Sequence, residues 1–472
     1  MPKIPLTNVG LQQNVTQEAV SNAQVEMFDV FVDEFGYINR RPGLLQLVDL
    51  GTNAKVDGLY WWQEKEMLIA VSAGNCYSLD VDGNSTNLGS GLERDTYVSF
   101  ASANPSGTAT LLIANGGRIY KTTGSTLTVI SDADAPTNVT TVTFLDQYIL
   151  ANNANTPSIH YSAVNDPDTW QATSIVTAET KPDNVTGIYS SYEDFIAVGT
   201  DSIETFYNDG SSPFTRRQGL FVDIGSISPY SFQRIDELWL FLDAKRRVVT
   251  LSNGTWKSIS NEIEKELQSL DTIEDAGSDI IFYNGRIFYV LHFPTEMKTF
   301  VYDLTFGSWY RWGLWNTSTS VYDRWLGNTH AYSKTWNTHY VGSRADGKIY
   351  KFNSSYQDDA GAEIRGKVVT GGITHGTLNR KSSERLMIRA KRGVGISGST
   401  TEPVVMYRYK NNGSEIWSNS IQIGLGKLGE YDTHRRLNRL GYYRVRQHEF
   451  SITDATTLLF GEAEEELTVS DN

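Results

Sequence analysis

Four carboxylates have the residue type that glycoside hydrolysis requires: Glu193, Asp194, Asp303 and Asp323. Glycosidases place two Asp or Glu side chains on opposite sides of the scissile bond, one as the acid and the other as nucleophile or base. Sequence alone does not place any two of these four opposite each other in a cleft. We therefore assign no catalytic residue and expect a chain that is not an enzyme, with a glycosidase kept as the alternative.

Two glycine-containing stretches resemble ligand-binding loops but lack the parts that hold the ligand. Gly424–Gly429 reads G-x-G-x-x-G after a strand, yet Glu430-Tyr431-Asp432 follows instead of the helix that would face a pyrophosphate. The segment Asp80–Asn84 starts like a calcium loop, but its glycine comes two positions early and Gly91 stands where the bidentate glutamate belongs. Both read as β turns, and we expect no cofactor.

The histidines and the cysteine suggest neither a metal site nor a disulfide. The closest histidine pairs, His330 with His339 and His434 with His448, lack the spacing of helical metal ligands. Cys76 is the single cysteine, so no intrachain disulfide can form. We expect a buried thiol and no bound metal.

An aromatic run, Trp309-Tyr310-Arg311-Trp312 with Trp315 nearby, has two interpretations. Exposed rings can stack on sugars or bases, as a glycan-binding protein would need. Buried rings cover a large apolar area between packed sheets. We favour packing.

Turn dipeptides divide the chain into short β segments. Ile280–Tyr283 and Ile287–Val290 flank Asn284-Gly285, a strong hairpin signal because both turn residues tolerate positive φ. The one helix expected is short, with Asn261 as its cap and Ile263 and Leu267 as an apolar pair. The fold class is therefore all-β.

The β segments repeat at a nearly constant interval. Aromatic residues after a turn fall at Trp170, Phe214, Trp256 and Trp309, at intervals of 44, 42 and 53 residues. Units of about 40–50 residues with four strands are typical of propeller blades. We predict a β-propeller of six or seven blades, with up to seven units between Val56 and Asn353. Gly36–Val48 is strand-like and can close the ring on the last blade; an array of sandwiches is the alternative.

The charge changes sign along the chain. The 472 residues carry 41 Lys or Arg and 55 Asp or Glu, a formal charge of −14. Residues 361–450 hold sixteen basic and seven acidic residues, and the last 22 residues carry −6, which leaves −17 for residues 1–360. Alternating strands such as Val404–Lys410 indicate a second, sandwich-like β domain. We expect an N-terminal arm with the ring-closing strand (1–50), a propeller (51–355) and a C-terminal β domain (356–472), to which the arm can contribute.

The ends of the chain give two further expectations. Glu462–Glu466 reads as a solvated acidic tail. The first residues lack the apolar core and cleavage site of a secretory signal, and no apolar stretch is long enough to span a membrane. We expect a protein made in a reducing cytoplasm, without a membrane segment.

Several motifs together resemble the packaged-DNA stabilisation proteins, the tail hub or nozzle subunits of short-tailed bacteriophages. They cover residues from about 30 to 455, and the Asn-Asp-Pro-x-x-Trp and Ala-Glu-x-x-Pro-Asp runs are the most distinctive. The segments that carry the resemblance are Tyr37–Gly43, His160–Trp170, Thr177–Ile188, Ile203–Tyr207, Val301–Trp309 and Arg435–Gly441.

The resemblance implies a structural virion protein without catalytic residues or cofactors. Members form a ring, expected to be a homohexamer, below the portal and its adaptor ring. They retain the packaged DNA, form the channel for its ejection without sequence-specific binding, and support a tail fibre or spike and a needle or plug. The implied location is the phage tail, after assembly in the host cytoplasm. The alternative is a propeller glycosidase or glycan-binding tail protein that acts on host polysaccharide.

The basic region suggests where such a subunit attaches. An acidic surface repels a DNA duplex and lets it slide, because each neutralised phosphate would add affinity. A basic surface suits an acidic protein partner. The candidate residues for docking or for contacts between subunits are Arg385, Arg389, Arg392, Arg435, Arg436, Arg439, Arg444 and Arg446.

Overall fold

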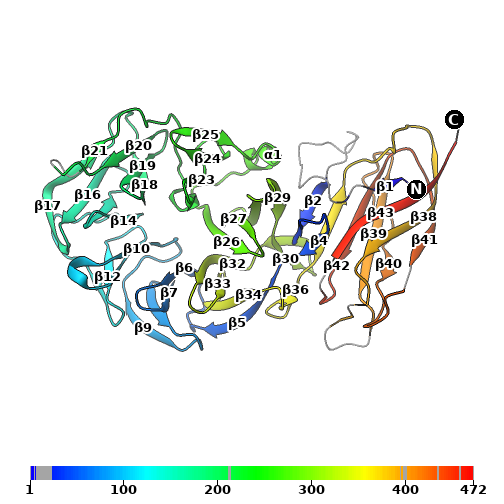
Figure 1. The fold of residues 1–472 in the computed structure, drawn as a ribbon, viewed down its shortest axis with the longest axis horizontal. Coiled ribbons are helices and arrows are strands. Elements are labelled where there is room, and N and C mark those ends of the chain that lie inside the picture. Colours follow the sequence, from blue (N-terminus) through cyan, green and yellow to red (C-terminus); the bar gives the residue numbers. More distant parts are fainter. Residues whose placement is uncertain are drawn as a thin grey trace.

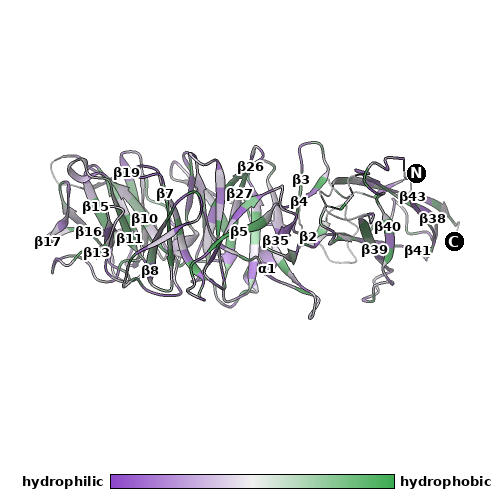
Figure 2. Ribbon diagram, turned by 90° about the horizontal axis from the view of Figure 1, so that it is seen from below, coloured by the Kyte–Doolittle hydropathy of each residue, from purple (hydrophilic) through white to green (hydrophobic). Residues whose placement is uncertain are grey.

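The chain folds into two β-rich units that lie side by side along the long axis of the molecule, as a computed structural model shows (Figure 1). The structure describes residues 2–4, 6, 24–210, 214–393, 395–396, 401–432, 435–456 and 459–470. Apolar segments follow the strands of both units, while the turns at their edges are mostly hydrophilic (Figure 2). Within these residues, no helix is long and apolar enough to cross a membrane.

The larger unit is a ring of seven four-stranded blades, counted over the described residues (Figure 1). The first strands of the blades are β6 (Val56–Trp62), β10 (Ser99–Ala103), β14 (Val142–Leu145), β18 (Val185–Ser191), β22 (Gln233–Ile235), β26 (Gly277–Tyr283) and β32 (Gly327–Ser333). The second strands are β7 (Met67–Ser72), β11 (Thr110–Ala114), β15 (Tyr148–Asn152), β19 (Asp194–Gly199), β23 (Leu238–Leu242), β27 (Arg286–Phe293) and β33 (Thr338–Ser343).

The outer half of each blade is less regular. The third strands are β8 (Asn75–Leu79), β12 (Tyr120–Thr122), β16 (Ser158–Ala163), β20 (Ile203–Tyr207), β24 (Val248–Ser252), β28 (Lys298–Asp303) and β34 (Lys348–Asn353). The fourth strands are β9 (Ser85–Ser90), β13 (Leu127–Val129), β17 (Asp166–Thr177), β21 (Thr215–Arg216), β25 (Thr255–Ser258), β29 (Ser308–Arg311) and, from the start of the chain, β5 (Gly43–Asp49). The all-β propeller prediction is therefore confirmed.

The aromatic repeat marks the fourth strands. Trp170, Trp256 and Trp309 lie on β17, β25 and β29, and Phe214 directly precedes β21. Trp170, Phe214 and Trp309 are buried, so these rings fill the space between blades. The ring closes where β5 pairs antiparallel with β34, with Leu44 opposite Phe352. Because β5, from the start of the chain, supplies the fourth strand of the last blade, β34 is not left as an open edge at the closure.

The predicted hairpin turn is present, whereas the predicted helix cap is not. Asn284 and Gly285 have φ values of 48° and 73° and connect β26 to β27 as a two-residue hairpin. The helix α1 (Glu264–Gln268) exists, but its N-cap is Ile263 and no side chain caps it, so the predicted cap at Asn261 is wrong. Short 3₁₀ turns occur at Pro105–Gly107 and Pro229–Ser231.

The smaller unit is a sandwich of two sheets built from both ends of the chain. One sheet has the order β3 (Val30–Val32), β4 (Ile38–Arg40), β43 (Leu459–Val469), β38 (Lys381–Ala390) and β41 (Arg436–Tyr443), with β1 (Lys3–Ile4) also paired to β43. The other has the order β2 (Gln24–Phe28), β37 (Gly366–Thr370), β42 (Arg446–Ile452), β39 (Val404–Asn411) and β40 (Ile421–Gly424). Met27, Leu386, Tyr407 and Phe450 are among the side chains buried between the sheets.

The acidic chain end does not form a solvated tail, and that expectation is wrong. Residues Leu459–Val469 form β43, an interior strand that pairs with β38 on one side and with β1 and β4 on the other. The strand alternates, so Ala463 and Glu465 face the core while Glu462, Glu464 and Glu466 face outward. Glu465 is tolerated inside because hydrogen-bonding partners surround it.

The two units are joined by a continuous sheet and by a buried ion cluster. Strand β2 pairs in parallel with β29, at Phe28 and Arg311, so the sixth blade runs into the sandwich. Beside this pairing the Arg41 side chain is fully buried, and its guanidinium donates to Asp29 Oδ1 at 2.6 Å and to both carboxylate oxygens of Asp359, at 2.5 and 2.9 Å. It also donates to the carbonyl of Gly313 at 3.2 Å.

The remaining elements lie near this junction. A hairpin of β30 (Gly313–Asn316) and β31 (Val321–Arg324) leads from the sixth blade to the seventh, and β35 (Asp358–Asp359) with β36 (Ala362–Glu363) follows the propeller. Arg41 therefore fixes the N-terminal segment, the β30 hairpin and the exit from the propeller to one another. Arg40, the neighbour of Arg41 in the sequence motif, donates to the carbonyls of Gln357 and Asp454 in the same region.

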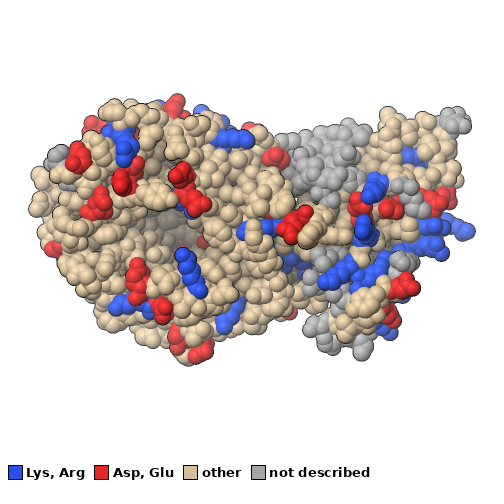
Figure 3. Space-filling view, viewed as in Figure 1, with Lys and Arg blue, Asp and Glu red and all other residues tan. Residues whose placement is uncertain are grey.

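The propeller axis holds a cavity of 330 Å³, lined by both aromatic and polar side chains. Stacked pairs surround it: Tyr60 with Phe100, Tyr189 with Phe232, and a tilted Tyr97–Tyr230 pair. The face shown in Figure 3 is hollowed at this axis. The rings close the axis to anything larger than a small molecule.

A buried carboxylate at this axis gives a pH-dependent prediction. Burial raises the pKa of Asp279 to about 7, against a hydrogen bond from the His330 backbone N–H, 3.0 Å from Oδ1. The folded protein therefore takes up a proton that the unfolded chain does not, so Asp279 disfavours folding at pH 8 and this penalty fades as the pH falls to 5. Asp279→Asn, which keeps the acceptor oxygen, should stabilise the protein at pH 8 by about 1–3 kcal/mol and by less at pH 5.

Urea unfolding of both proteins at pH 8 and pH 5 measures this difference. Asp82→Asn, in an exposed hairpin turn, serves as the control and should show no such dependence. An Asp279→Asn protein that is less stable than the parent at pH 8 would contradict the assignment.

Candidate docking surface

The eight arginines proposed from the sequence lie on the sandwich, and the structure divides them into three groups. On the face of Figure 3, Lys and Arg gather over this unit, next to acidic side chains. Strand β41 is an edge of its sheet, which leaves one side of its backbone unpaired. The groups differ in burial and in ion pairing.

Four arginines are exposed and form no ion pair within the described residues: Arg389, Arg436, Arg439 and Arg444, called here the open arginines. Arg436 and Arg439 belong to β41, and Arg389 lies on the adjacent strand β38. Arg444 follows β41 and donates to the carbonyl of Leu378 at 2.9 Å. These side chains are available for an acidic partner.

Three arginines have partners in their own chain. Arg385 lies 3.4 Å from Glu466, and Arg435 lies 3.5 Å from Glu402. Arg392 is half-buried and donates to the carbonyl of Ile388 at 3.2 Å; burial, with Arg435 nearby, lowers the pKa of Arg392. Exposed pairs of this kind contribute little stability, so Arg385 and Arg435 can exchange their partners for others.

Arg446 is part of the core and cannot contact a partner directly. Its side chain is completely buried, 3.2 Å from Glu465, and stacks on the rings of Tyr409 and Tyr443 at 4.2 and 4.0 Å. Glu465 also accepts hydrogen bonds from Ser383 at 2.5 Å, Tyr443 at 2.6 Å and His375 at 3.2 Å. Burial alone would raise the pKa of Glu465, but these partners lower it to about 2. Because Arg446 is buried, it does not belong to the candidate docking surface.

The basic and acidic segments share one surface. Opposite Arg385 on the outer face of the sheet stand Glu466 of β43 and Asn438 of β41, and opposite Met387 stand Glu464 and Arg436. The acids of β43 therefore lie among the arginines, and the charge split along the chain is partly cancelled in space. The net basic character is concentrated at the edge strand β41, farther from β43.

The other candidate residues and loops form ion pairs and hydrogen bonds with residues near them in the structure. Asp303 is buried against Arg286, and Asp194 pairs with Arg217 at 2.6 Å. Asp323 lies on β31 and accepts a hydrogen bond from Asn316 at 3.4 Å. The G-x-G-x-x-G loop donates its Gly426 N–H to Glu402 at 3.1 Å, and Asp80 accepts the N–H groups of Asp82 and Asn84 in a hairpin turn.

The cysteine is buried, and the described members of the two histidine pairs contact neighbouring side chains. The rings of His330 and His339 meet at 3.0 Å between Nε2 and Nδ1, and burial lowers their pKa values to about 3 and about 4. His448 is buried beside Tyr407, while His434 lies outside the described residues. Burial raises the pKa of Cys76 to about 12. In the part of the chain that the structure describes, no group of three or more metal-binding side chains converges.

The aromatic run mainly serves packing. Trp309, Tyr310 and Trp312 are 1 % exposed, and only Trp315, which lies under the guanidinium of Arg365 at 4.0 Å, is half-exposed. The rings of Trp312 and Trp325 meet edge-on at 5.0 Å in the core between the two units. The run is therefore unavailable as a platform for sugars or bases, except at Trp315.

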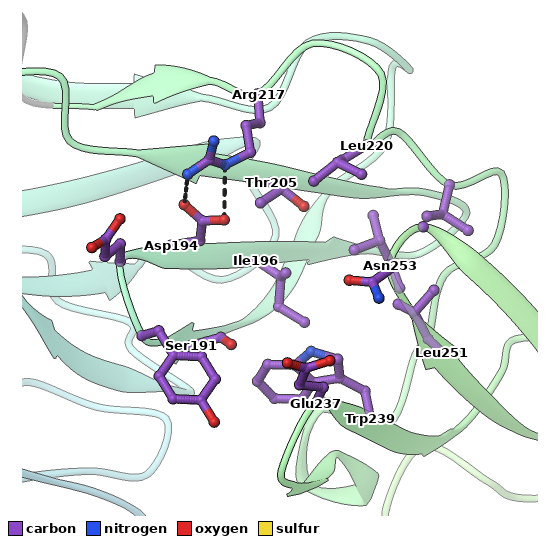
Figure 4. Close-up of a pocket in the computed structure, with 15 residues that line it drawn as sticks. Ser191, Asp194, Ile196, Thr205, Arg217, Leu220, Glu237, Trp239, Leu251 and Asn253 are labelled. Carbon is purple, nitrogen blue, oxygen red and sulfur yellow. Dashed lines mark hydrogen bonds and ion pairs between the residues drawn. The ribbon is translucent and has the colours of Figure 1, made fainter.

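Sequence reasoning missed a cleft between the fourth and fifth blades, which we call the interblade cleft (Figure 4). It measures 320 Å³, its floor is formed by Ile196, Val222, Trp239 and Leu251, and Glu193 and Glu237 stand at its mouth. Asp194 and Arg217 form a two-bond ion pair along one wall (Figure 4). Glu193 and Asp194 stand out by residue type alone, and the equivalent turn positions of Glu193 and Glu237 in successive blades are the signal that connects the two blades.

Comparison with known proteins places the chain in a family. A family model described as Bacteriophage P22 Gp10, beta-propeller matches residues 3–357. That range contains the N-terminal strands of the sandwich and all seven blades. No curated protein matches the chain. Because the family model covers about three quarters of the sequence, the chain belongs to this family of phage packaged-DNA stabilisation proteins, which are structural β-propeller proteins.

Proposed function

We propose that the protein is a hub, or nozzle, subunit of a short phage tail. In this role copies form a ring, expected to have six members, below the portal and its adaptor ring. The ring helps to retain packaged DNA, forms the channel through which DNA leaves, and supports a fibre or spike and a needle or plug. Assembly takes place in the host cytoplasm before the subunit becomes part of the virion. Membership of the packaged-DNA stabilisation family is the observation that carries this proposal.

The closed axis of the propeller supports a channel between copies rather than within one. The axial cavity of 330 Å³ is blocked by Tyr97, Tyr189 and Tyr230, and a DNA duplex is far wider than this space. A passage for DNA must then be enclosed by several subunits. The excess of acids in residues 1–360, −17 in all, would keep such a passage from gripping phosphates.

The edge strand β41 supports attachment to an acidic protein surface. Its open arginines can form bidentate hydrogen bonds with carboxylates, and Arg is enriched at protein interfaces for this reason. The edge also lacks a neighbouring strand. The docking role of these arginines, for the portal–adaptor ring or for contacts between copies, is part of the proposal.

Reversing the charge at the start of β41 tests this role. Arg435→Glu, Arg436→Glu and Arg439→Glu together should reduce attachment to DNA-filled heads by at least 100-fold, because like charges would face each other at the interface. The measure is the fraction of heads that carry the subunit after sedimentation. Normal attachment of the triple variant would contradict the docking role.

A matched control separates charge from misfolding. Lys65→Glu, Lys257→Glu and Lys334→Glu make the same charge change at exposed positions of the propeller and should leave attachment intact. Unchanged urea unfolding of the β41 variant would show that its sandwich is folded, because these three side chains make no buried contacts.

The alternative, a glycan-cleaving or glycan-binding propeller, has its best location in the interblade cleft. Glu193 and Glu237 would be its acid and base. Purified protein that releases sugars from host polysaccharide, with the activity lost in Glu237→Gln, would favour this alternative over a structural subunit. Binding without release would favour a glycan-binding protein.

A further inference from the structure

The interblade cleft has an apolar floor and an acidic mouth. Ile196 and Val222 on the floor are 6 % and 5 % exposed, and Trp239 is 8 % exposed. Glu193 and Glu237 lie in the two-residue turns that connect the first and second strands of adjacent blades. A side chain with an apolar stem and a cationic head matches this arrangement, since Lys and Arg bury their methylenes and keep the charge at the surface.

The two mouth carboxylates have no partner of their own. Within the described residues, neither Glu193 nor Glu237 forms a hydrogen bond or an ion pair. The nearby Arg217 is already held by Asp194, with both of its bonds between 2.6 and 2.8 Å. The mouth of the cleft therefore carries two carboxylates that no ion pair of the described residues neutralises, although the cleft already has one internal ion pair.

Aromatic rings at the same place already hold a guanidinium. Arg234 stacks on the rings of Tyr192 at 4.4 Å and Trp239 at 5.6 Å. Tyr192 is 73 % exposed and has a φ of 53°, an uncommon conformation for an aromatic residue, which sets its ring at the mouth of the cleft. These rings can attract a second cation by the same cation–π interaction.

The sandwich of the same chain supplies a matching group. Arg439 is the outward residue of a β-bulge, because Arg439 and Leu440 together oppose the single residue Glu384 between two regular pairs. Leu440 is buried and Arg439 is exposed with a φ of 59°. Bulges at sheet edges redirect a side chain, and here the redirected one is an open arginine on the edge strand β41.

Electrostatics explains why this pairing would matter in a ring. Each copy carries −14, so copies repel one another unless local patches of opposite sign meet. A head-to-tail contact, with a different surface on each side, can close into a ring when repeated by rotation. An acidic cleft on the propeller and an arginine edge on the sandwich are two such different surfaces.

We propose that the interblade cleft of one copy receives Arg439 of the next copy in the ring. The guanidinium lies between Glu193 and Glu237, and its stem lies on Ile196 and Val222. This contact rests on the proposed ring, and it assigns the open arginine of the bulge to the interface between copies. A basic segment of the portal–adaptor ring is the competing occupant.

Paired cysteines test the contact directly. Glu237→Cys and Arg439→Cys are made in separate chains, mixed, assembled with the portal–adaptor complex and oxidised; Cys76 is buried and does not interfere. We expect a cross-linked dimer on a non-reducing gel from the mixture and from neither variant alone. Asp82→Cys, on another blade, replaces Glu237→Cys in the control and should give no cross-linked species with Arg439→Cys.

A charge exchange gives a second readout. Glu193→Arg with Glu237→Arg should reduce ring formation at least tenfold, and adding Arg439→Glu to the same chain should restore it. Rings that form normally in the cleft variant, or rings without the cross-link, would overturn the contact while leaving the proposed function intact. A parent protein that forms no rings with the complex would overturn the proposed function, and the contact with it.

Discussion

Replacing Arg41 with methionine is expected to lower the free energy of unfolding by about 3–5 kcal/mol, because it leaves two buried carboxylates without their cation. Asp29 and Asp359 are both fully buried, and Arg41 is the only cation that the structure shows in an ion pair with either of them. Methionine keeps much of the length of the side chain, so the loss comes from the charge and its hydrogen bonds rather than from a cavity.

The pH dependence of this loss follows from Asp29. Burial, opposed by Arg41, already raises the pKa of Asp29 to about 6. Without the guanidinium this pKa rises further, and a protonated Asp29 carries no stranded charge. Arg41→Met should therefore be less destabilising at pH 5 than at pH 8, which is the direction expected when the folded state binds the extra proton.

Urea unfolding at both pH values, combined with limited proteolysis at the junction, measures these effects. Adding Asp29→Asn and Asp359→Asn to the variant removes both stranded charges and should recover part of the loss. Arg436→Met, at an exposed position, serves as the control and should change stability by less than about 0.5 kcal/mol. A loss below about 1 kcal/mol for Arg41→Met would show that the cluster does not hold the two units together.

Removing residues 459–472 is expected to unfold the sandwich. The deletion takes out β43, which pairs with three other strands, and exposes the apolar surface that Phe460 and Ala463 cover. It also leaves Arg446 buried without Glu465, a loss of about 3–5 kcal/mol by itself. If this segment were instead an acidic tail in solvent, its deletion would leave the sandwich folded.

The control for this deletion is removal of residues 470–472 alone, which lie after β43 and should leave the fold intact. Protease resistance of the sandwich, followed by mass spectrometry, distinguishes the two units. A sandwich that remains resistant without residues 459–472 would contradict the interior position of β43.

The propeller was predictable because its information is local and repeated. The Asn284-Gly285 turn depends on residues close in sequence, and the nearly constant interval between Trp170, Phe214, Trp256 and Trp309 repeats along the chain. Ring closure by the strand-like segment Gly36–Val48 could be inferred because a propeller needs a partner for its last blade. The closing strand itself is Gly43–Asp49, while Ile38–Arg40 belongs to the sandwich.

The sandwich was less predictable because its decisive contacts join distant segments. Glu465 reads as a solvated residue within an acidic run, and only His375, Ser383 and Arg446, at separations of 90, 82 and 19 residues, explain its burial. Arg446 and Arg436 cannot be told apart by residue type, yet Arg446 lies in the core and Arg436 lies on an edge strand. Alternation along a strand predicts two faces but not which face another sheet covers.

The interblade cleft illustrates a third kind of limit on sequence reasoning. Glu193 and Glu237 are 44 residues apart, which is one repeat, so their turns occupy equivalent places in neighbouring blades. Their separation matches the repeat, but an acidic turn residue is common on any surface. Only the packing of two blades adds the apolar floor beneath them.

We propose that this chain assembles as the ring subunit of a phage tail. Negative-stain microscopy of the purified protein mixed with the portal–adaptor complex tests it most directly. We expect a ring of copies, six in number, attached below the adaptor and absent when the complex is replaced by an unrelated ring-shaped protein. Protein that stays monomeric and unattached in the same mixture would contradict it.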